Sequence, residues 1–261
     1  MTDTVELLDL ATEAVAVGVA LLRAEPAGQV RTKSSATDLV TDMDGRVESV
    51  VVAALLDARP SDAVLGEEGG ERRGSTGVRW LIDPIDGTTN YVYGYPPHAV
   101  SVAAEVDGQL AAGVVADVSH DDLYRARLGA GAECNGTTIT ASSRAELATA
   151  LVATGFSYEP DRRRAQAQVL TDVLPRVRDI RRAGAATVDL CWVASGRVDA
   201  YYEQGLKPWD WAAGGLIARE AGARVRGIEA SADPPGYVLA AAPAIFDALE
   251  ALLDDAGAAD T

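Results

Sequence analysis

Several residue types are scarce in this chain of 261 residues, and their scarcity excludes whole classes of protein. The two cysteines, Cys134 and Cys191, stand far apart and outside any CxxC spacing, so neither a disulfide framework nor a zinc site is expected. This cysteine usage is typical of a reducing compartment, and we expect a cytoplasmic location. The only histidines, His98 and His120, are expected to be structural or exposed, as lone histidines usually are.

Positive charge and long hydrophobic runs are scarce as well. The chain has 23 Lys and Arg against 39 Asp and Glu, which gives a formal net charge of -16 at pH 7. Nucleic-acid and anionic membrane surfaces are bound by clustered Lys and Arg, so neither partner is expected. Apolar runs such as Ala99 to Ala104 are too short to span a membrane, and the acidic N-terminus does not resemble a signal peptide. The acidity would repel phosphate substrates unless bound cations reversed the local field.

The periodicity of the remaining sequence predicts one compact unit with two different halves. In residues 1–140 we expect two helices packed against an antiparallel or mixed sheet. The expected elements are helices Val5 to Leu22 and Arg46 to Ala58, and strands Ala63 to Gly66, Val78 to Ile82, Ala99 to Val106, Leu110 to Val118 and Leu123 to Arg127. Residues 141–261 alternate between strand and helix, which is typical of an α/β arrangement. The expected strands are Ala150 to Thr154, Val198 to Tyr202 and Tyr237 to Ala241, and the expected helices are Asp161 to Arg178, Gly184 to Ala194, Trp211 to Ala221 and Pro243 to Leu253.

The most informative segment runs from Asp83 to Asn90 and reads Asp-Pro-Ile-Asp-Gly-Thr-Thr-Asn. Pro84 cannot donate a ladder hydrogen bond, so the strand is expected to end at Asp83. The carboxylates of Asp83 and Asp86 and the carbonyl of Ile85 can then converge, and hard cations such as Mg²⁺ prefer these oxygens. A helix opening at Gly87 would offer free N–H groups to a phosphate. The same residue types also form ordinary turns and helix caps, so the segment alone does not decide between a cap and a metal-phosphate site.

Other carboxylates could join this turn. Glu67 and Glu68 follow a short apolar strand, whereas Asp42 and Asp44 precede the second predicted helix. Such residues are usually helix caps or solvated charges. Asp210 differs, because it stands between Trp209 and Trp211 at the head of a helix, where a partly buried carboxylate needs a partner.

The only two lysines, Lys33 and Lys207, stand close in sequence to these carboxylates. Lys207 lies three residues before Asp210. Lys33 begins a polar loop that leads to Asp38, and a functional interpretation would place it near phosphate.

Taken together, these strings resemble the inositol monophosphatase family of Mg²⁺-dependent, lithium-sensitive phosphatases. The resemblance is carried by Gly66-Glu67-Glu68, by Trp80 to Asn90 and by Trp209-Asp210. Supporting matches extend from about residue 5 to 250. They are Lys33 with Asp38 to Thr41, Cys134-Asn135-Gly136, Gly184-Ala185-Ala186, Asp189-Leu190-Cys191 and Asp199 to Glu203.

The resemblance implies a layered αβαβα sandwich of the inositol monophosphatase and fructose-1,6-bisphosphatase type, a homodimer, and two to three Mg²⁺ ions. It implies that Glu67, Asp83 and the Ile85 carbonyl bind one ion, that Asp83, Asp86 and Asp210 bind a second, and that a third lies near Glu67. Thr88, Glu67 and Asp44 would orient and deprotonate the attacking water. The remaining implied contacts are Gly87 and Thr88 to the phosphate, and Asp86, Gly184, Ala186, Glu203 and Asp210 to the polyol.

Inositol monophosphate is the favoured substrate, because the run Arg181 to Ala186 with Glu203 most resembles members of the family that act on it. Fructose 1,6-bisphosphate, histidinol phosphate and 3′-phosphoadenosine phosphates stay open, since the metal motif does not select the alcohol. Arg181 and Arg182 could admit a second phosphate. A non-enzymatic role through protein partners in transcription is the remaining alternative from the resemblance.

The sequence motifs of two other phosphatase mechanisms match this chain less well than those of the inositol monophosphatase family. Cys191 and Arg197 spell a Cys-x5-Arg string, but the segment is expected to be an apolar helix and not a phosphate-binding loop. Asp42-Met43-Asp44-Gly45 resembles an aspartyl-phosphate motif, but it lacks a long apolar strand before it. Both are kept as minor alternatives.

Overall fold

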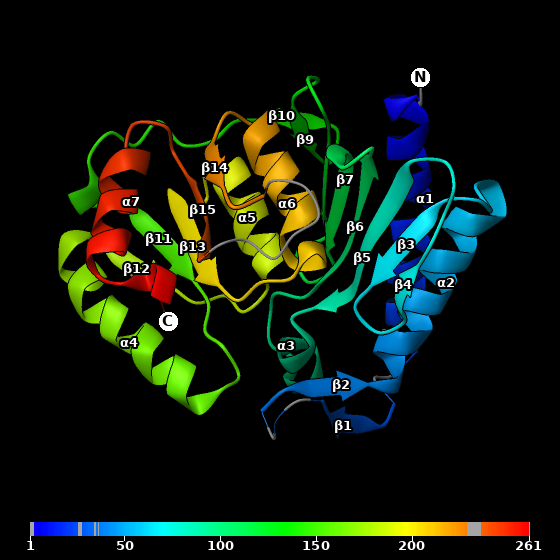
Figure 1. The fold of residues 1–261 in the computed structure, drawn as a ribbon, viewed down its shortest axis with the longest axis horizontal. Coiled ribbons are helices and arrows are strands. Elements are labelled where there is room, and N and C mark those ends of the chain that lie inside the picture. Colours follow the sequence, from blue (N-terminus) through cyan, green and yellow to red (C-terminus); the bar gives the residue numbers. More distant parts are fainter. Residues whose placement is uncertain (1–2, 26–27, 34, 36, 229–235, 261) are drawn as a thin grey trace.

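The computed structural model describes residues 3–25, 28–33, 35, 37–228 and 236–260. Its α-helices and strands form five layers in the order helix, sheet, helix, sheet, helix (Figure 1). The helices are α1 (Thr4–Ala24), α2 (Asp42–Ala58), α3 (Thr88–Tyr93), α4 (Pro160–Val173), α5 (Ala186–Ala194), α6 (Pro208–Glu220) and α7 (Phe246–Asp255). The predicted αβαβα sandwich is therefore confirmed.

The first half builds a mixed sheet of eight strands, in the order β10-β9-β8-β7-β6-β5-β3-β4. Only β3 and β5 pair in parallel. The bounds are β3 (Ala63–Gly66), β4 (Gly70–Arg72), β5 (Val78–Asp86), β6 (Ala99–Val106), β7 (Gln109–Asp117), β8 (Asp122–Arg127), β9 (Ala132–Cys134) and β10 (Thr137–Ile139). The predicted hairpin of β6 and β7 is confirmed, with Asp107 and Gly108 both at positive φ as a type I′ turn requires. A separate two-stranded ribbon, β1 (Val30–Thr32) with β2 (Leu39–Thr41), precedes α2.

The second half builds a sheet of five strands, in the order β12-β11-β13-β15-β14. The bounds are β11 (Leu151–Thr154), β12 (Asp179–Arg181), β13 (Ala200–Gln204), β14 (Arg224–Arg226) and β15 (Tyr237–Ala241). Strand β11 pairs in parallel with both neighbours, whereas β15 is antiparallel to β13 and β14. Helices α5 and α6 lie between the two sheets (Figure 1).

The layers are held together by three apolar cores. Strand β5 shows why both faces of the first sheet are apolar: Trp80 and Ile82 pack toward α1 and α2, whereas Leu81 packs toward α5 and α6. Successive strand residues point to opposite faces, so a strand buried on both sides reads as a continuous hydrophobic run. The third core packs α4 and α7 onto the far face of the second sheet, with Val169, Tyr202 and Leu249 among its members.

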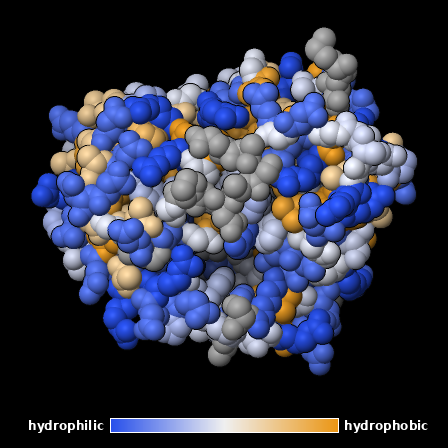
Figure 2. All heavy atoms as spheres, in the orientation of Figure 1, coloured by the Kyte–Doolittle hydropathy of each residue, from blue (hydrophilic) through white to orange (hydrophobic). Residues whose placement is uncertain are grey.

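The exposed surface and the lengths of the described helices match the expectations from charge and hydrophobic runs. The face in Figure 2 is mainly hydrophilic, with small and separate hydrophobic patches. None of the described helices is long and apolar enough to cross a membrane.

Several predicted boundaries were wrong because local contacts extend or end an element. Helix α2 begins at Asp42 and not at Arg46, since Thr41 caps it and Asp44 completes a capping box. Helix α6 likewise begins at Pro208, which places Asp210 inside its first turn. Helix α4 ends at Val173 and a short 3₁₀ turn follows, whereas α7 begins at Phe246 and not at Pro243. The short strands β1, β2, β4, β9, β10, β12 and β14 were not predicted.

Candidate active site

A cavity of about 350 Å³ opens where the ends of β5 and β13 meet the first turns of α3, α5 and α6. Its lining unites residues from both halves of the chain, including most of those singled out from the sequence. The lining residues are Lys33, Asp38, Leu39, Glu67, Asp83, Ile85, Asp86, Gly87, Thr88, Phe156, Ser157, Tyr158, Arg162, Arg182, Gly184, Ala186, Glu203, Gln204, Gly205, Leu206, Lys207, Trp209 and Asp210.

Asp83 and Asp86 lie at an irregularity within strand β5. The prediction that the strand ends at Asp83 was wrong. Strand β5 continues to Asp86, and its pairing with β6 is interrupted between Asp83 and Asp86. Pro84 in this stretch cannot donate to the ladder, which is why the register shifts there. Gly87 then turns the chain into α3 with a φ of 87°, and a Cβ there would lie 3.0 Å from the carbonyl oxygen of Pro97. Glycine is therefore required both by conformation and by close packing.

Asp83 is the most deeply buried carboxylate of the cavity lining. Only 2% of its surface is exposed, and its Oδ1 has no hydrogen-bond partner among the described residues. Burial raises the pKa of Asp83 well above its ordinary value, and the nearby charges of Glu67, Asp86 and Asp210 raise the pKa further. An unpaired buried carboxylate oxygen is costly, so this atom is suited to a cation.

Asp86 links the two halves of the molecule. Its Oδ1 accepts the N–H of Ala186 at 3.2 Å, and its Oδ2 accepts the N–H and hydroxyl of Thr187 at 2.7 and 2.5 Å. These donors lie in the first turn of α5, where backbone N–H groups have no helical partner. Burial raises the pKa of Asp86, and the bonds from Thr187 and Ala186 partly offset that rise.

Asp44 and Thr88 form a buried relay beside the turn. Asp44 Oδ2 accepts the backbone N–H of Thr41 at 2.7 Å and its hydroxyl at 2.6 Å. The Thr88 hydroxyl lies 2.9 Å from Asp44 Oδ1 and 3.0 Å from the carbonyl oxygen of Ile85, and its single hydrogen can serve either acceptor. With that hydrogen committed, the Thr88 oxygen can only accept a hydrogen bond from the cavity.

Glu67 and Asp210 approach the same cavity from opposite sides. Glu67 Oε1 lies 2.7 Å from Nζ of Lys33, which also contacts Glu68. Burial raises the pKa of Glu67 to about 7 in spite of the opposing charge of Lys33. Asp210 Oδ2 accepts the N–H of Lys207 at 2.6 Å, and burial raises the pKa of Asp210 well above its ordinary value.

These donors suit hard divalent cations, although the side chains are not arranged as a finished ligand sphere. Within the described residues, no three acidic, histidine or cysteine side chains stand close enough together to hold a metal ion as they are. Glu67 is turned to Lys33 and Asp86 to Thr187, while Asp83 Oδ1 is left unpaired. The donor set consists of oxygens only, which is the chemistry that Mg²⁺ prefers.

The other end of the cavity is formed by the second half of the chain. Glu203 accepts a hydrogen bond from the Tyr201 hydroxyl at 2.7 Å, and burial raises the pKa of Glu203 to about 7. Arg182 lies against Gly184, since a Cβ at Gly184 would stand 2.2 Å from its Nη1. Arg162 reaches over from α4, with its Nη2 3.4 Å from Gln204 Oε1.

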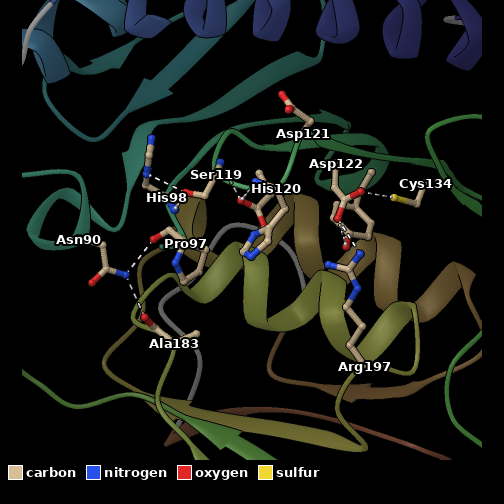
Figure 3. Close-up of polar contacts among 12 residues, drawn as sticks. Asn90, Pro97, His98, Ser119, His120, Asp121, Asp122, Cys134, Ala183 and Arg197 are labelled. Carbon is tan, nitrogen blue, oxygen red and sulfur yellow. Dashed lines mark hydrogen bonds and ion pairs between the residues drawn. The ribbon is translucent and has the colours of Figure 1, made fainter. Parts of the chain in front are cut away.

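Asn90 ties α3 to this second wall. Its side-chain amide donates to the carbonyl oxygens of Pro97 and Ala183, at 2.8 and 2.9 Å (Figure 3). The Ala183 peptide precedes Gly184, so the turn that follows Asp86 also fixes the loop that enters α5. A terminal Asn of the motif thus joins the two halves.

The two histidines and the alternative catalytic residues lie outside the cavity lining. His98 contacts the Ser119 hydroxyl at 3.0 Å (Figure 3). His120 contacts Asp117 at 2.7 Å. Cys191 is fully buried in α5, whereas Arg197 pairs with Asp122 at 2.7 Å, so the two do not form a phosphate loop.

The second alternative, based on Asp42, also loses support. Asp42 is half-exposed and pairs with Arg31 at 2.6 Å. It is absent from the lining of the cavity.

Sequence reasoning missed several residues at or beside the cavity, among them Tyr158, Arg162 and Glu48. Tyr158 and Arg162 line it from the α4 region, and no motif surrounds either of them. Glu48 lies beneath the Glu67 turn and bonds its backbone. The signal for Glu48 was its position four residues after Asp44, on the same face of α2.

Comparison with known proteins places the chain in a well-defined group. The profile of the inositol monophosphatase family matches residues 3–257. The inositol-1-monophosphatase of Mycobacterium bovis is 48% identical over 236 residues, which cover 87% of this chain and 81% of that protein. A protein of Vibrio cholerae named Nus factor SuhB is 38% identical over 216 residues, covering 81% of each chain. The crystal structure of the extragenic suppressor protein suhB from Bartonella henselae has a TM-score of 0.89 at 33% identity, covering 95% of this chain and 98% of that one.

Proposed function

The chain belongs to the inositol monophosphatase family, and we propose that it is a Mg²⁺-dependent phosphomonoesterase whose substrate is a small polyol phosphate, inositol monophosphate before others. The observation that carries this proposal is the unpaired, buried Oδ1 of Asp83 at the centre of an all-oxygen donor set. Such a centre needs positive charge before it can admit a phosphate, because the whole chain is acidic.

Two to three Mg²⁺ ions are proposed for this cavity. Glu67, Asp83 and the Ile85 carbonyl would hold one ion, Asp83, Asp86 and Asp210 a second, and Glu67 would adjoin a third. When bound, the ions would supply a water of lowered pKa and a counter-charge for the departing alkoxide.

The residues around Thr88 would aim the attacking water. The Thr88 hydroxyl donates toward Asp44 or the Ile85 carbonyl, so its oxygen is left to accept a hydrogen bond from water. Glu67 would take up the proton of that water, since its carboxylate lines the same cavity as Thr88. Asp44 would orient the Thr88 hydroxyl through its Oδ1, because its Oδ2 is already held by Thr41.

The remaining lining residues would bind the substrate. The N–H groups of Gly87 and Thr88 and the ammonium of Lys33 are proposed to face the phosphate. The polyol hydroxyls would meet Asp86, Gly184, Ala186, Glu203 and Asp210. The homodimer and the lithium sensitivity implied by the resemblance stay predictions, as does the cytoplasmic location expected from the cysteine usage.

Phosphate release from inositol 1-phosphate by the purified chain tests the proposal. We expect turnover with Mg²⁺ and none after treatment with EDTA, restored when Mg²⁺ is returned. A chain that releases no phosphate from any sugar or polyol phosphate under these conditions would contradict the enzymatic function.

A substrate with a second anionic group is a second candidate, favoured by Arg182 and Arg162. Both guanidinium groups line the cavity beyond the carboxylates, and among the described residues none hydrogen-bonds Arg182. Arg182 also lies close enough to Glu203 to lower its pKa. Comparing turnover of inositol 1-phosphate with that of fructose 1,6-bisphosphate decides between the two candidates.

A protein-interaction role in transcription is the non-enzymatic alternative. The relatives named Nus factor SuhB lend weight to it. The complete set of proposed metal ligands and Thr88 favours catalysis, since a binding scaffold has no need of them. The Mg²⁺-dependent release of phosphate separates the two roles.

A further inference from the structure

The turn that carries Glu67 is held by a residue to which the proposed mechanism gives no role. This turn joins β3 to β4 and consists of Glu67, Glu68 and Gly69. Glu48 approaches it from α2 with 6% of its surface exposed. One carboxylate oxygen of Glu48 accepts the N–H of Glu68 at 2.9 Å, and the other accepts the N–H of Gly69 at 2.6 Å.

Two glycines make room for this carboxylate. A Cβ added at Gly66 would lie 2.4 Å from Oε2 of Glu48, and a Cβ added at Gly69 would lie 2.6 Å from its Oε1. Neither glycine has a φ in the left-handed region, so the backbone conformation does not call for glycine at either position. The close approach of Glu48 is therefore what requires them.

The Glu48 carboxylate combines a cost of burial with a gain from two hydrogen bonds. Glu48 is buried, and it lies near the like charge of Glu68 and the opposite charge of Lys33. Its two charge-assisted bonds to backbone N–H groups offset that cost. An apolar side chain of the same size would avoid the repulsion from Glu68, but it would leave the two N–H groups without an acceptor and could not fix their direction.

We propose that Glu48 is a positioning residue for Glu67. The N–H of Glu67 donates to the carbonyl oxygen of Ile82 at 3.2 Å, and the next two N–H groups donate to Glu48. The backbone on each side of Glu67 is thus held by a different element, β5 before it and α2 after it. This fixes the direction from which the Glu67 carboxylate enters the cavity. The inference rests on the proposed role of Glu67 as a metal ligand.

The test is binding of Mg²⁺ alone to the purified full chain, measured by calorimetry, together with hydrogen exchange of the Glu68 and Gly69 amides. In Glu48→Gln the amide oxygen can accept one N–H, but the NH₂ group faces the other. We expect the dissociation constant for Mg²⁺ to rise about tenfold, as is typical when a supporting partner of a ligand is removed. The two amides should lose protection. The matched control is Glu71→Gln, an exposed glutamate on β4 of the same hairpin, which should change neither readout.

A double variant separates positioning from a general structural role. In a Glu67→Gln background, Glu48→Gln should weaken Mg²⁺ binding no further, because the ligand that it positions is gone. A further tenfold loss in that background would overturn the inference. Unchanged Mg²⁺ binding in Glu67→Gln would overturn the proposed metal site and this inference with it. A loss in Glu67→Gln with none in Glu48→Gln would overturn the inference alone.

A second variant covers the case in which Glu48→Gln fails to fold. Gly69→Ala keeps Glu48 but places a methyl group against its Oε1. We expect the same weakening of Mg²⁺ binding and the same loss of amide protection. Wild-type values for both readouts would overturn the inference.

Discussion

The two walls of the cavity are built in different ways. The first-half wall consists mainly of short side chains at a strand irregularity and in first helical turns, and Asp44, Asp83 and Thr88 are buried there. Its two long side chains, Lys33 and Glu67, are paired with each other at 2.7 Å. The second-half wall carries long side chains such as Arg162 and Arg182, together with glycines at positive φ. Asp210 is the exception, since α6 brings it across to the carboxylates. The comparison teaches that the proposed metal site is built mainly from buried, hydrogen-bonded groups, while the long arginine side chains lie at the far end of the cavity.

Among substitutions in the first wall, Asp83→Asn is expected to lower turnover most. The amide keeps the shape but cannot supply the charge that two ions would share, so we expect turnover to fall about a thousandfold or more. Phosphate release at saturating Mg²⁺ measures this loss. Near-normal turnover in this variant would refute the metal site.

A smaller loss is expected from Thr88→Val, which removes the oxygen that would accept a hydrogen bond from water. Turnover should fall about a hundredfold, while Mg²⁺ binding stays close to wild type, because Thr88 is not a proposed ligand. The neighbouring Thr89→Val is the matched control, since Thr89 does not line the cavity, and it should keep most of the activity. Equal losses in the two variants would mean that the effect comes from packing of α3.

Arg182→Met tests the role of the second wall in substrate selection, and Arg181→Met is its control. Arg181 is exposed and pairs with Asp179 at 2.7 Å, away from the cavity lining. If Arg182 contacts a second anionic group, the ratio of kcat/KM for fructose 1,6-bisphosphate to that for inositol 1-phosphate should fall about tenfold. The ratio should not change in the control. An unchanged ratio in both variants removes the second candidate substrate.

The smallest effect concerns stability and pH in the absence of metal. Burial raises the pKa of Glu67 and of Glu203 to about 7 from ordinary values of 4.5. Between these values the folded chain binds more protons than the unfolded chain, so the free energy of unfolding falls as pH rises. Each kcal/mol lost lowers Tm by about 2–4 °C.

Thermal unfolding between pH 5 and pH 8 measures this dependence. Tm of the metal-free chain should fall across this range, and added Mg²⁺ should reduce the fall. A metal-free Tm that rises toward pH 8 would contradict the raised pKa values.

The grouping of residues at the turn in the first wall could be predicted from the sequence because it is local, whereas the roles of Glu67 and Asp44 were implied only by the family resemblance. Asp83, Ile85, Asp86, Gly87 and Thr88 stand in one short run, and a short-range pattern places them together. The strand end was misplaced because pairing with β6 resumes at Asp86, beyond Pro84, and no local signal shows that a partner strand is available there. The missed short strands have the same origin, since they exist only through their neighbours.

The second wall could not be predicted in the same way. Tyr158 and Arg162 reach the cavity because α4 packs on the second sheet. This packing is a tertiary contact, and no local sequence pattern predicts it. Glu203 and Ala186 were identified through the family resemblance and not through their surroundings. Glu48 illustrates the limit most clearly, because its role depends on the backbone of a turn about 20 residues away in sequence.

The central claim is that the carboxylates around Asp83 hold divalent cations. Anomalous diffraction from crystals of the wild-type chain soaked in Mn²⁺ tests it most directly, because the ion is located without reference to activity. We predict strong peaks within ligand distance of Asp83 Oδ1, shared with Glu67 on one side and with Asp86 and Asp210 on the other. Well-ordered crystals with no peak at Asp83 would contradict the account.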